Sequence, residues 1–139
     1  MKVTEAVFGQ GMRVAAWCCI GAIGIISLLP AAEMASVRTN LGGHGEHLLA
    51  YAATSMITAL AYLYHSRLKI GASLVFYAAV LEFLQRYAPG RLSSFEDLAF
   101  SAAGVTLGLA AFHLLQHVRA RQEIRKGSRY ANEDVNSSS

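Results

Sequence analysis

The chain has little charge for its length. Charged residues make up 15% of the 139 positions, and apolar residues make up 54%, whereas about a quarter of the residues in a soluble domain are charged. The apolar residues come in blocks of helical length instead of being scattered, which disfavours a soluble globule. The length leaves room for one domain. Composition therefore indicates an all-α membrane protein.

Cysteines and ligand motifs are equally sparse. Cys18 and Cys19 are neighbours, so they cannot join distant segments, and a disulfide framework is excluded. The net charge is +3, but the sequence has no basic stripe with interleaved aromatic residues, and we expect no nucleic-acid partner. His44-x-x-His47 has the ligand types of a zinc site but lacks the His-Glu-x-x-His spacing, so we expect no metal and no cofactor.

Four apolar blocks predict a bundle of four transmembrane helices, near residues 10–29, 47–65, 70–88 and 94–117. The two prolines, Pro30 and Pro89, end the first and third blocks. The first block is long for a signal peptide and no clean Ala-x-Ala site follows it, so we expect a retained helix.

These blocks form a predicted membrane domain over residues 1–118. Residues 119–139 form a basic tail that ends in N-E-D-V-N-S-S-S. This end is too polar to pack, and we expect it to be disordered. The tail arginines can act as an orientation signal or as a patch for lipid headgroups.

The basic residues are distributed unevenly over the predicted connections. With four spans, the N-terminus, the second connection and the tail share one side, and they hold nine of the twelve Lys and Arg residues. The other side holds only Arg38, Arg86 and Arg91. By the positive-inside rule, both termini are cytoplasmic, and the Pro89–Ser94 turn faces outward. We expect a multi-pass protein of the bacterial inner membrane.

Polar residues gather at the outward ends of three predicted helices. Glu82 lies in a hydrophobic block, where an unpaired charge is unfavourable. Residues one helical turn apart share a face, so three groups can converge: His44, His47 and Tyr51; Glu82, Gln85 and Arg86; and Asp97, Ser101, Gly104 and Gly108. Arg91 is the expected partner of Asp97, because a guanidinium binds carboxylate or phosphate through two hydrogen bonds.

Structural explanations compete with a functional one at each position. Glu82 could pair with Arg86 or Arg91 only to hold helices together. Asp97 could serve as a helix-start residue, with Ser93-x-x-Glu96 as a capping box. His47 could be an interfacial residue hydrogen-bonded to a carboxylate. The Gly104-x-x-x-Gly108 spacing permits close helix packing, either within the chain or in a dimer.

Three segments carry a resemblance to a known family. They read E-H-L-L-A-Y from Glu46, E-F-L-Q from Glu82 and R-L-S-S-F-E-D-L-A-F-S-A-A-G from Arg91. In order and separation they resemble the VanZ-like family of small membrane proteins, named for a protein that confers low-level teicoplanin resistance. The resemblance covers roughly residues 38–110. It implies a set of signature positions: His47, Tyr51, Glu82, Gln85, Arg91 and Asp97. Many members have Lys and Asn where this chain has His44 and Ser101.

The expected function is binding of a membrane lipid or a lipid-linked cell-wall intermediate at the external face, which would modulate envelope or glycopeptide-antibiotic tolerance. Arg91 would hold phosphate or carboxylate, and His47, Tyr51 and Gln85 would donate hydrogen bonds. An intramembrane enzyme is the second hypothesis, with Glu82, His47 and Asp97 as catalytic candidates. A structural or assembly subunit is the third. The oligomeric state stays open.

Overall fold

The computed structural model describes residues 2–34, 42–91 and 94–137, and every regular element in these ranges is helical. Helix α1 covers Lys2–Leu28, and the short α2 covers Ala31–Met34. Helix α3 covers Gly42–Ala61, and α4 covers Arg67–Leu84, followed by the 3-10 turn η1 at Gln85–Tyr87. Helix α5 covers Phe95–Ser137. The predicted all-α class is confirmed.

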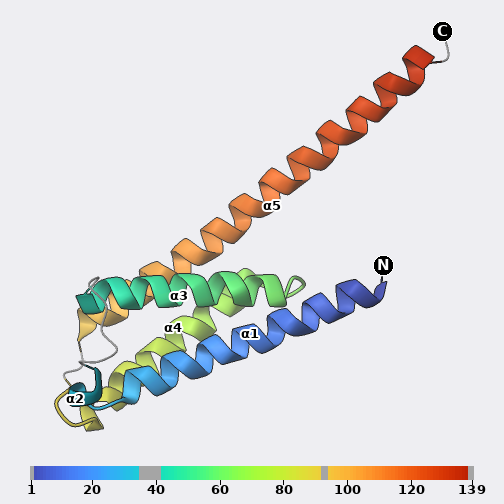
Figure 1. Cartoon of the computed structure of the whole chain (residues 1–139). Helices are drawn as coiled ribbons and strands as arrows, with labels where there is room; N and C mark the ends of the chain where they lie inside the picture. The colour runs from blue at the N-terminus through green and yellow to red at the C-terminus, as the bar shows by residue number, and fades with distance from the viewer. Residues whose placement is uncertain (1, 35–41, 92–93, 138–139) are drawn as a thin grey trace.

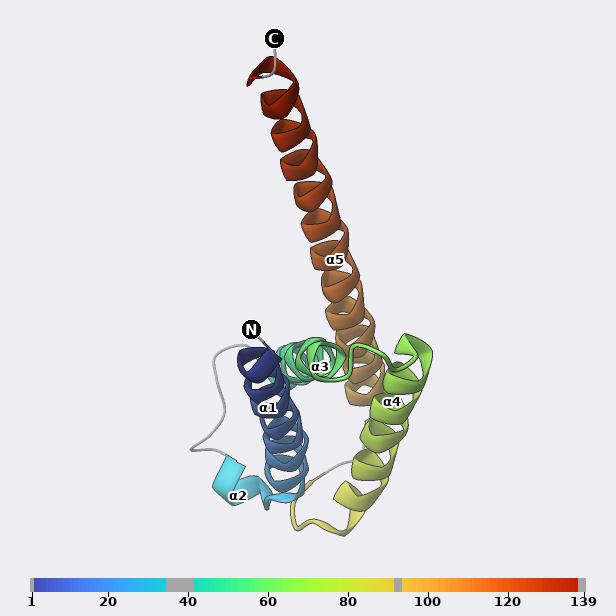
Figure 2. The same cartoon turned by 90° about the vertical axis from the view of Figure 1, so that its right-hand side faces the viewer.

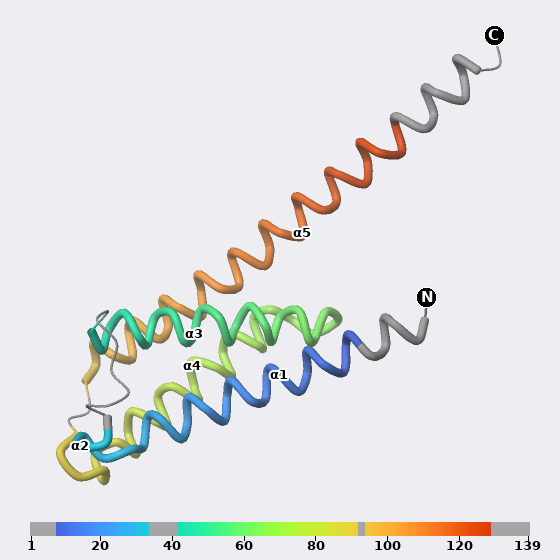
Figure 3. The backbone as a smooth tube through the Cα atoms, viewed as in Figure 1, coloured from blue at the N-terminus to red at the C-terminus, as the bar shows by residue number. Residues whose placement is uncertain are grey.

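The long helices alternate in direction (Figure 1, Figure 2). The turn between α3 and α4 lies at one end of the bundle, and α5 projects beyond that end (Figure 3). The first turns of α1 lie at the same end (Figure 1). Helix α2 and the connection from α4 to α5 lie at the other end, which we call the α2 end. The backbone N–H of Ala31 donates to the Pro89 carbonyl there, at 3.2 Å. The first and third predicted connections therefore meet at one end.

Three of the described helices are long and apolar enough to cross a membrane, and the chain is a multi-pass membrane protein by this measure. They are Phe8–Leu28, Arg67–Tyr87 and the Phe95–Ser128 part of α5. Large apolar side chains point away from the bundle, including Trp17 (64% exposed) and Phe76 (71% exposed). Exposed apolar surface on this scale suits contact with acyl chains better than contact with water.

Helix α3 differs from the other three long helices. It carries His44, Glu46 and His47 in its first turns, and it is not among the helices that meet the length and hydropathy criteria for a span. Its polar residues Thr54 and Ser55 are buried inside the bundle. The structure thus bears out three of the four predicted spans.

Helix boundaries differ from the predicted ones for local reasons. Helix α3 begins at Gly42, not near residue 47, because Gly42 adopts a φ of 72° that favours glycine at the turn into the helix. Helix α4 ends at Leu84 and tightens into η1, and Ala88 is then extended with ψ of 128°. The ring of Pro89 disfavours helical geometry at the residue before it.

Helix α5 continues to Ser137, past the predicted end near residue 117. The basic tail therefore continues the helix as far as Ser137, into the polar end for which the sequence predicts disorder. The tail is polar, but it is rich in Arg, Gln, Glu and Lys, which are good helix formers, and no proline interrupts it. Polarity excludes packing into a core and does not exclude a solvated helix.

Arg67 closes the turn between α3 and α4. Its guanidinium donates to the carbonyls of Ala59 and Tyr62, both at 3.1 Å, and of Leu63 at 2.7 Å. These are carbonyls at the C-terminal end of α3, where a cation is favoured by the helix dipole. The same guanidinium carbon lies 4.4 Å from the ring centroid of Phe112 on α5. Arg67 thus has a structural role in addition to its place in the charge count.

Helices α3 and α5 pack backbone to backbone along the predicted small-residue stripe. A Cβ placed on Gly104 would overlap the Leu48 carbonyl, and one placed on Gly108 would overlap the Ala52 carbonyl and the Ser55 hydroxyl. The Ser55 hydroxyl donates to the Val105 carbonyl at 3.1 Å. The Gly104-x-x-x-Gly108 stripe therefore packs within the chain.

We predict that Gly108→Ala lowers the free energy of unfolding by about 1–3 kcal/mol, because the added methyl group has no room between α5 and α3. Gly21→Ala is the matched control, since a Cβ at Gly21 meets nothing within 4 Å. Denaturant titration in mixed micelles, monitored by circular dichroism, measures the free energy of unfolding of both variants. Equal stability of the two variants would contradict the close packing.

Candidate functional site

The predicted polar residues of α3 and α5 meet at the α2 end of the bundle. His44 and His47 occupy successive turns of α3, and Asp97 and Ser101 occupy successive turns of α5. The glycines further along α5 bring the two helices close enough for these side chains to bond in pairs. The predicted convergence of these two faces is confirmed.

Asp97 pairs with His44. The Asp97 Oδ1 atom lies 2.9 Å from His44 Nδ1, and Glu96 Oε2 lies 3.4 Å from the other ring nitrogen, Nε2. The His44 ring also stacks on Phe100, with centroids 4.8 Å apart. Among the described residues, Arg91 forms no ion pair with Asp97, so the predicted Arg91–Asp97 partnership is wrong. The Asp97 carboxylate is paired instead with His44 on the facing helix α3.

His47 is bonded to Ser101. The Ser101 hydroxyl donates its single proton to the Asp97 carbonyl at 2.8 Å. Its oxygen must therefore act as the acceptor toward His47 Nδ1, which lies 3.2 Å away. The tautomer of His47 with its proton on Nδ1 satisfies this contact, and in that tautomer Nε2 is the acceptor nitrogen. His47 is thus arranged to accept a hydrogen bond, whereas the sequence analysis expected it to donate one.

Glu82 is buried at the end of α4, with 7% of its surface exposed. Its carboxylate accepts a short hydrogen bond from the backbone N–H of Ser94, just before α5 begins. Within the described ranges it forms no ion pair with Arg86 or Arg91, the two partners considered as structural alternatives. Arg86 is exposed and lies over the Phe83 ring, 5.5 Å from its centroid. Glu82 is therefore satisfied by a backbone donor at the positive end of a helix.

The start of α5 is capped by Ser94. Its hydroxyl oxygen accepts the backbone N–H of Glu96 at 3.2 Å, as an N-cap residue does. The predicted capping residue, Ser93, lies outside the described residues. Asp97 in the first turn is also favoured by the helix dipole, so its predicted helix-start role is compatible with its bond to His44.

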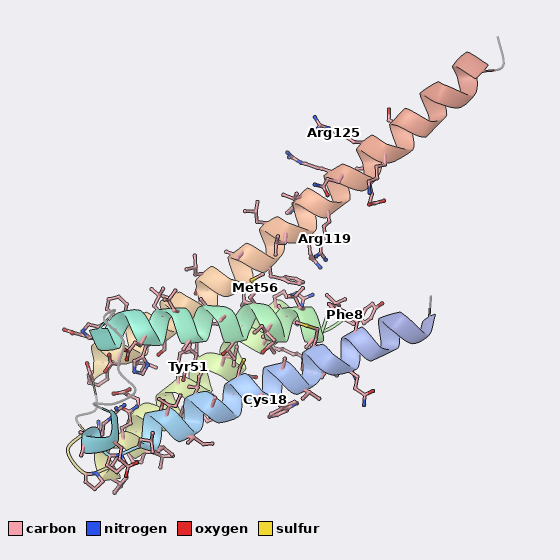
Figure 4. All side chains as sticks on the ribbon, viewed as in Figure 1. Phe8, Cys18, Tyr51, Met56, Arg119 and Arg125 are labelled. Atoms are coloured by element: carbon pink, nitrogen blue, oxygen red, sulfur yellow. The ribbon has the colours of Figure 1, made fainter. Side chains whose placement is uncertain are left out.

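A cavity of about 100 Å³ lies beside this network, between α1, α3 and the residue that follows the Pro89–Gly90 turn. Three predicted site residues line it: His47, Tyr51 and Arg91. Figure 4 shows Tyr51 projecting from α3 toward α1 and α4, and it is 2% exposed. The rest of the lining comes from α1 and α3 and consists of Ile23, Ile26, Ser27, Glu46 and Ala50.

The six predicted signature residues thus fall into three groups. His47, Tyr51 and Arg91 line the cavity. Glu82 and Gln85 are buried at the end of α4, and Asp97 lies with His44 at the surface of the α3–α5 contact. Ser27 and Glu46 also line the cavity, and neither is among the predicted site residues. Ser27 is a polar residue in an apolar block, and Glu46 adjoins His47, so both carried a usable signal.

The structure does not gather metal ligands at this end. Within residues 2–34, 42–91 and 94–137, no three His, Cys, Asp or Glu side chains are arranged to hold a metal ion. The arrangement instead offers a guanidinium, a carboxylate and an imidazole acceptor around a small cavity. Such a set can bind a polar group by charge and hydrogen bonding.

Comparison with known proteins found no matching family model, no similar curated protein and no similar solved structure.

We predict that Glu82→Ala lowers the free energy of unfolding by about 2 kcal/mol, because the Ser94 N–H loses its charged acceptor. Glu82→Gln keeps an oxygen acceptor at the same place, so its free energy of unfolding should fall by clearly less. Denaturant titration in mixed micelles measures both variants.

Glu96→Ala is the control for this comparison, since its carboxylate is 76% exposed and close to the same helix start. It should change stability by less than about 0.5 kcal/mol. A Glu82→Ala variant as stable as the wild type would show that the buried carboxylate is not what ties α4 to α5.

Proposed function

We propose that the chain crosses the bacterial inner membrane four times, with both termini in the cytoplasm. Helix α3 supports the fourth span, because it runs beside α1, α4 and the first part of α5 (Figure 2). A bilayer crossed by these three helices also encloses α3, whose buried hydroxyls are satisfied inside the bundle. The excess of Lys and Arg at the opposite end supports placing the α2 end outside.

The protein binds the polar headgroup of a membrane lipid, or of a lipid-linked cell-wall intermediate, at this external end. The observation that carries the proposal is the cavity that Arg91, His47 and Tyr51 line together. Its volume of about 100 Å³ is below the range of roughly 300–1,000 Å³ for sites that enclose a drug-sized ligand. It therefore suits one phosphate, carboxylate or amine group, with the rest of the ligand outside.

The hydrogen bonds of His47 narrow the range of possible ligands further. In the tautomer with its proton on Nδ1, the Nε2 atom of His47 is an acceptor and pairs with a donor on the ligand. Arg91 needs an anionic oxygen. A headgroup that carries an N–H or O–H donor close to a phosphate or carboxylate meets both requirements. Phosphoethanolamine and glycerol phosphate groups are of this kind, and phosphocholine is not.

The resemblance to VanZ-like proteins agrees with this proposal, since His47, Tyr51 and Arg91 are among the signature positions it implies. A role in envelope or glycopeptide tolerance would follow if the bound group belongs to a cell-wall intermediate. An intramembrane enzyme is the alternative, and one observation favours it. The unprotonated Nε2 of His47 beside Arg91 could act as a general base toward a bound lipid.

We predict that Arg91→Ala weakens lipid binding by more than about tenfold, which corresponds to about 1.4 kcal/mol. Arg86→Ala is the matched control, because Arg86 is an exposed arginine near the same turn that does not line the cavity. Native mass spectrometry of lipids retained by each purified variant measures the effect. Equal retention by the two variants would contradict a headgroup site at Arg91.

We also predict that the wild type binds short-chain phosphatidylethanolamine several-fold more tightly than short-chain phosphatidylcholine. The two headgroups have the same formal charge, but only the first has N–H donors for His47. In His47→Phe the preference should disappear while dependence on Arg91 remains. Titration calorimetry in detergent measures the affinity for each lipid. Equal affinity in the wild type would exclude His47 as an acceptor for the headgroup.

A further inference from the structure

A second group of histidines lies away from the cavity, on the part of α5 where the helix leaves the bundle. His113 and His117 are one helical turn apart, and both are exposed. Their Nε2 atoms point at each other and are 3.0 Å apart. The two rings are nearly perpendicular, at 89°, with centroids 4.4 Å apart. Neither residue takes part in the proposed headgroup site.

The backbone that carries this pair is held firmly on one side. Phe112, the residue before His113, is 2% exposed and lies under the Arg67 guanidinium. Beyond the pair, α5 projects away from the other helices, and Arg119 and Arg125 lie on this projecting part (Figure 4). We call residues 118–137 the α5 arm. The pair therefore occupies the junction between the packed part of α5 and the arm.

The separation of the two nitrogens matches that of neighbouring ligands on one metal ion. Imidazole nitrogens bind zinc at about 2.0–2.1 Å. At that length, two nitrogens lie about 2.9 Å apart for a right angle at the metal and about 3.4 Å apart for a tetrahedral angle. The observed 3.0 Å is close to the right-angle value, which tetragonal Cu²⁺ and Ni²⁺ sites require. A small side-chain rotation would reach the tetrahedral value for Zn²⁺.

We propose that His113 and His117 form a bidentate chelating site for a divalent transition metal ion, of the class Cu²⁺, Ni²⁺ or Zn²⁺. Imidazole is a preferred ligand of these ions, and both side chains lie on one regular helix, so binding needs little rearrangement. Before the metal binds, one Nε2 donates a proton to the other; when both Nε2 atoms bind the metal, that ring adopts the tautomer with its proton on Nδ1, so no proton is gained or lost. No redox step is involved.

The remaining coordination positions are open. No third His, Cys, Asp or Glu of the described ranges completes a cluster with the pair, so water or an external ligand fills these positions. Arg121, one turn after His117, carries a positive charge that opposes a bare cation. The site is therefore suited to reversible binding and not to a permanently held structural ion.

Metal binding would also strengthen the junction. An ion that bridges residues four apart holds one helical turn in place, and it binds the helical state in preference to the unfolded one. The α5 arm, which lacks packing partners in the bundle (Figure 1), would then be more firmly helical from its base. Metal binding would therefore raise the helical content of the α5 arm and leave the headgroup cavity unchanged.

The test uses the full-length protein without a polyhistidine tag, in detergent, with Cys18 and Cys19 replaced by serine so that thiols do not react with copper. Cu²⁺ is added, and its ligands are read by electron paramagnetic resonance. We expect one ion per chain with two equatorial nitrogens. Zn²⁺ should compete for the same site, as measured by titration calorimetry.

The matched control moves one histidine and keeps the composition. The double substitution Leu115→His with His117→Leu places the imidazoles two residues apart, on different sides of the helix, and should weaken binding more than tenfold. His65→Ala removes another exposed histidine and should leave binding unchanged. Wild-type binding no stronger than that of the double variant, or a signal lost in His65→Ala, would overturn the proposal. Lipid retention is measured in parallel, so that failure of the metal site is distinguished from failure of the headgroup site.

Discussion

The close approach of α3 and α5 is the constraint on which the α2 end depends. Gly104 and Gly108 leave no room for a side chain, and the Ser55 hydroxyl bonds directly to the α5 backbone. In a membrane, where water does not drive helices together, such contacts supply much of the association energy. Because the two backbones are this near, short side chains on both helices reach each other, and His47 can be held by Ser101.

The helical content and the location of the polar cluster could be predicted from the sequence, because both follow from hydrophobic block length and helical periodicity. The pairing of charges could not. Sequence spacing suggested Arg86 or Arg91 for Glu82, yet its carboxylate accepts a backbone N–H from Ser94. A free backbone donor at a helix start is invisible in side-chain patterns. Similarly, the sequence marks Arg67 only as one of the basic residues that set orientation, although its guanidinium caps α3.

This pairing changes which residues remain for function. Ser94 satisfies Glu82 and His44 satisfies Asp97, so both carboxylates have a structural task. Arg91 and His47 line the cavity instead. The candidate site is therefore smaller than the sequence pattern indicated, and Arg91 supplies its positive charge.

A site that combines Arg91 with His47 has a consequence for selectivity. If Arg91 alone faced the cavity, any anion of suitable size would bind, and abundant anionic lipids would compete with a specific ligand. In the proposed site, the acceptor nitrogen of His47 adds a preference for a ligand that carries a hydrogen-bond donor. Discrimination then depends on the distance between donor and anion in the headgroup. The Ser101 hydroxyl affects this discrimination indirectly, because its contact with His47 Nδ1 favours one tautomer of the imidazole.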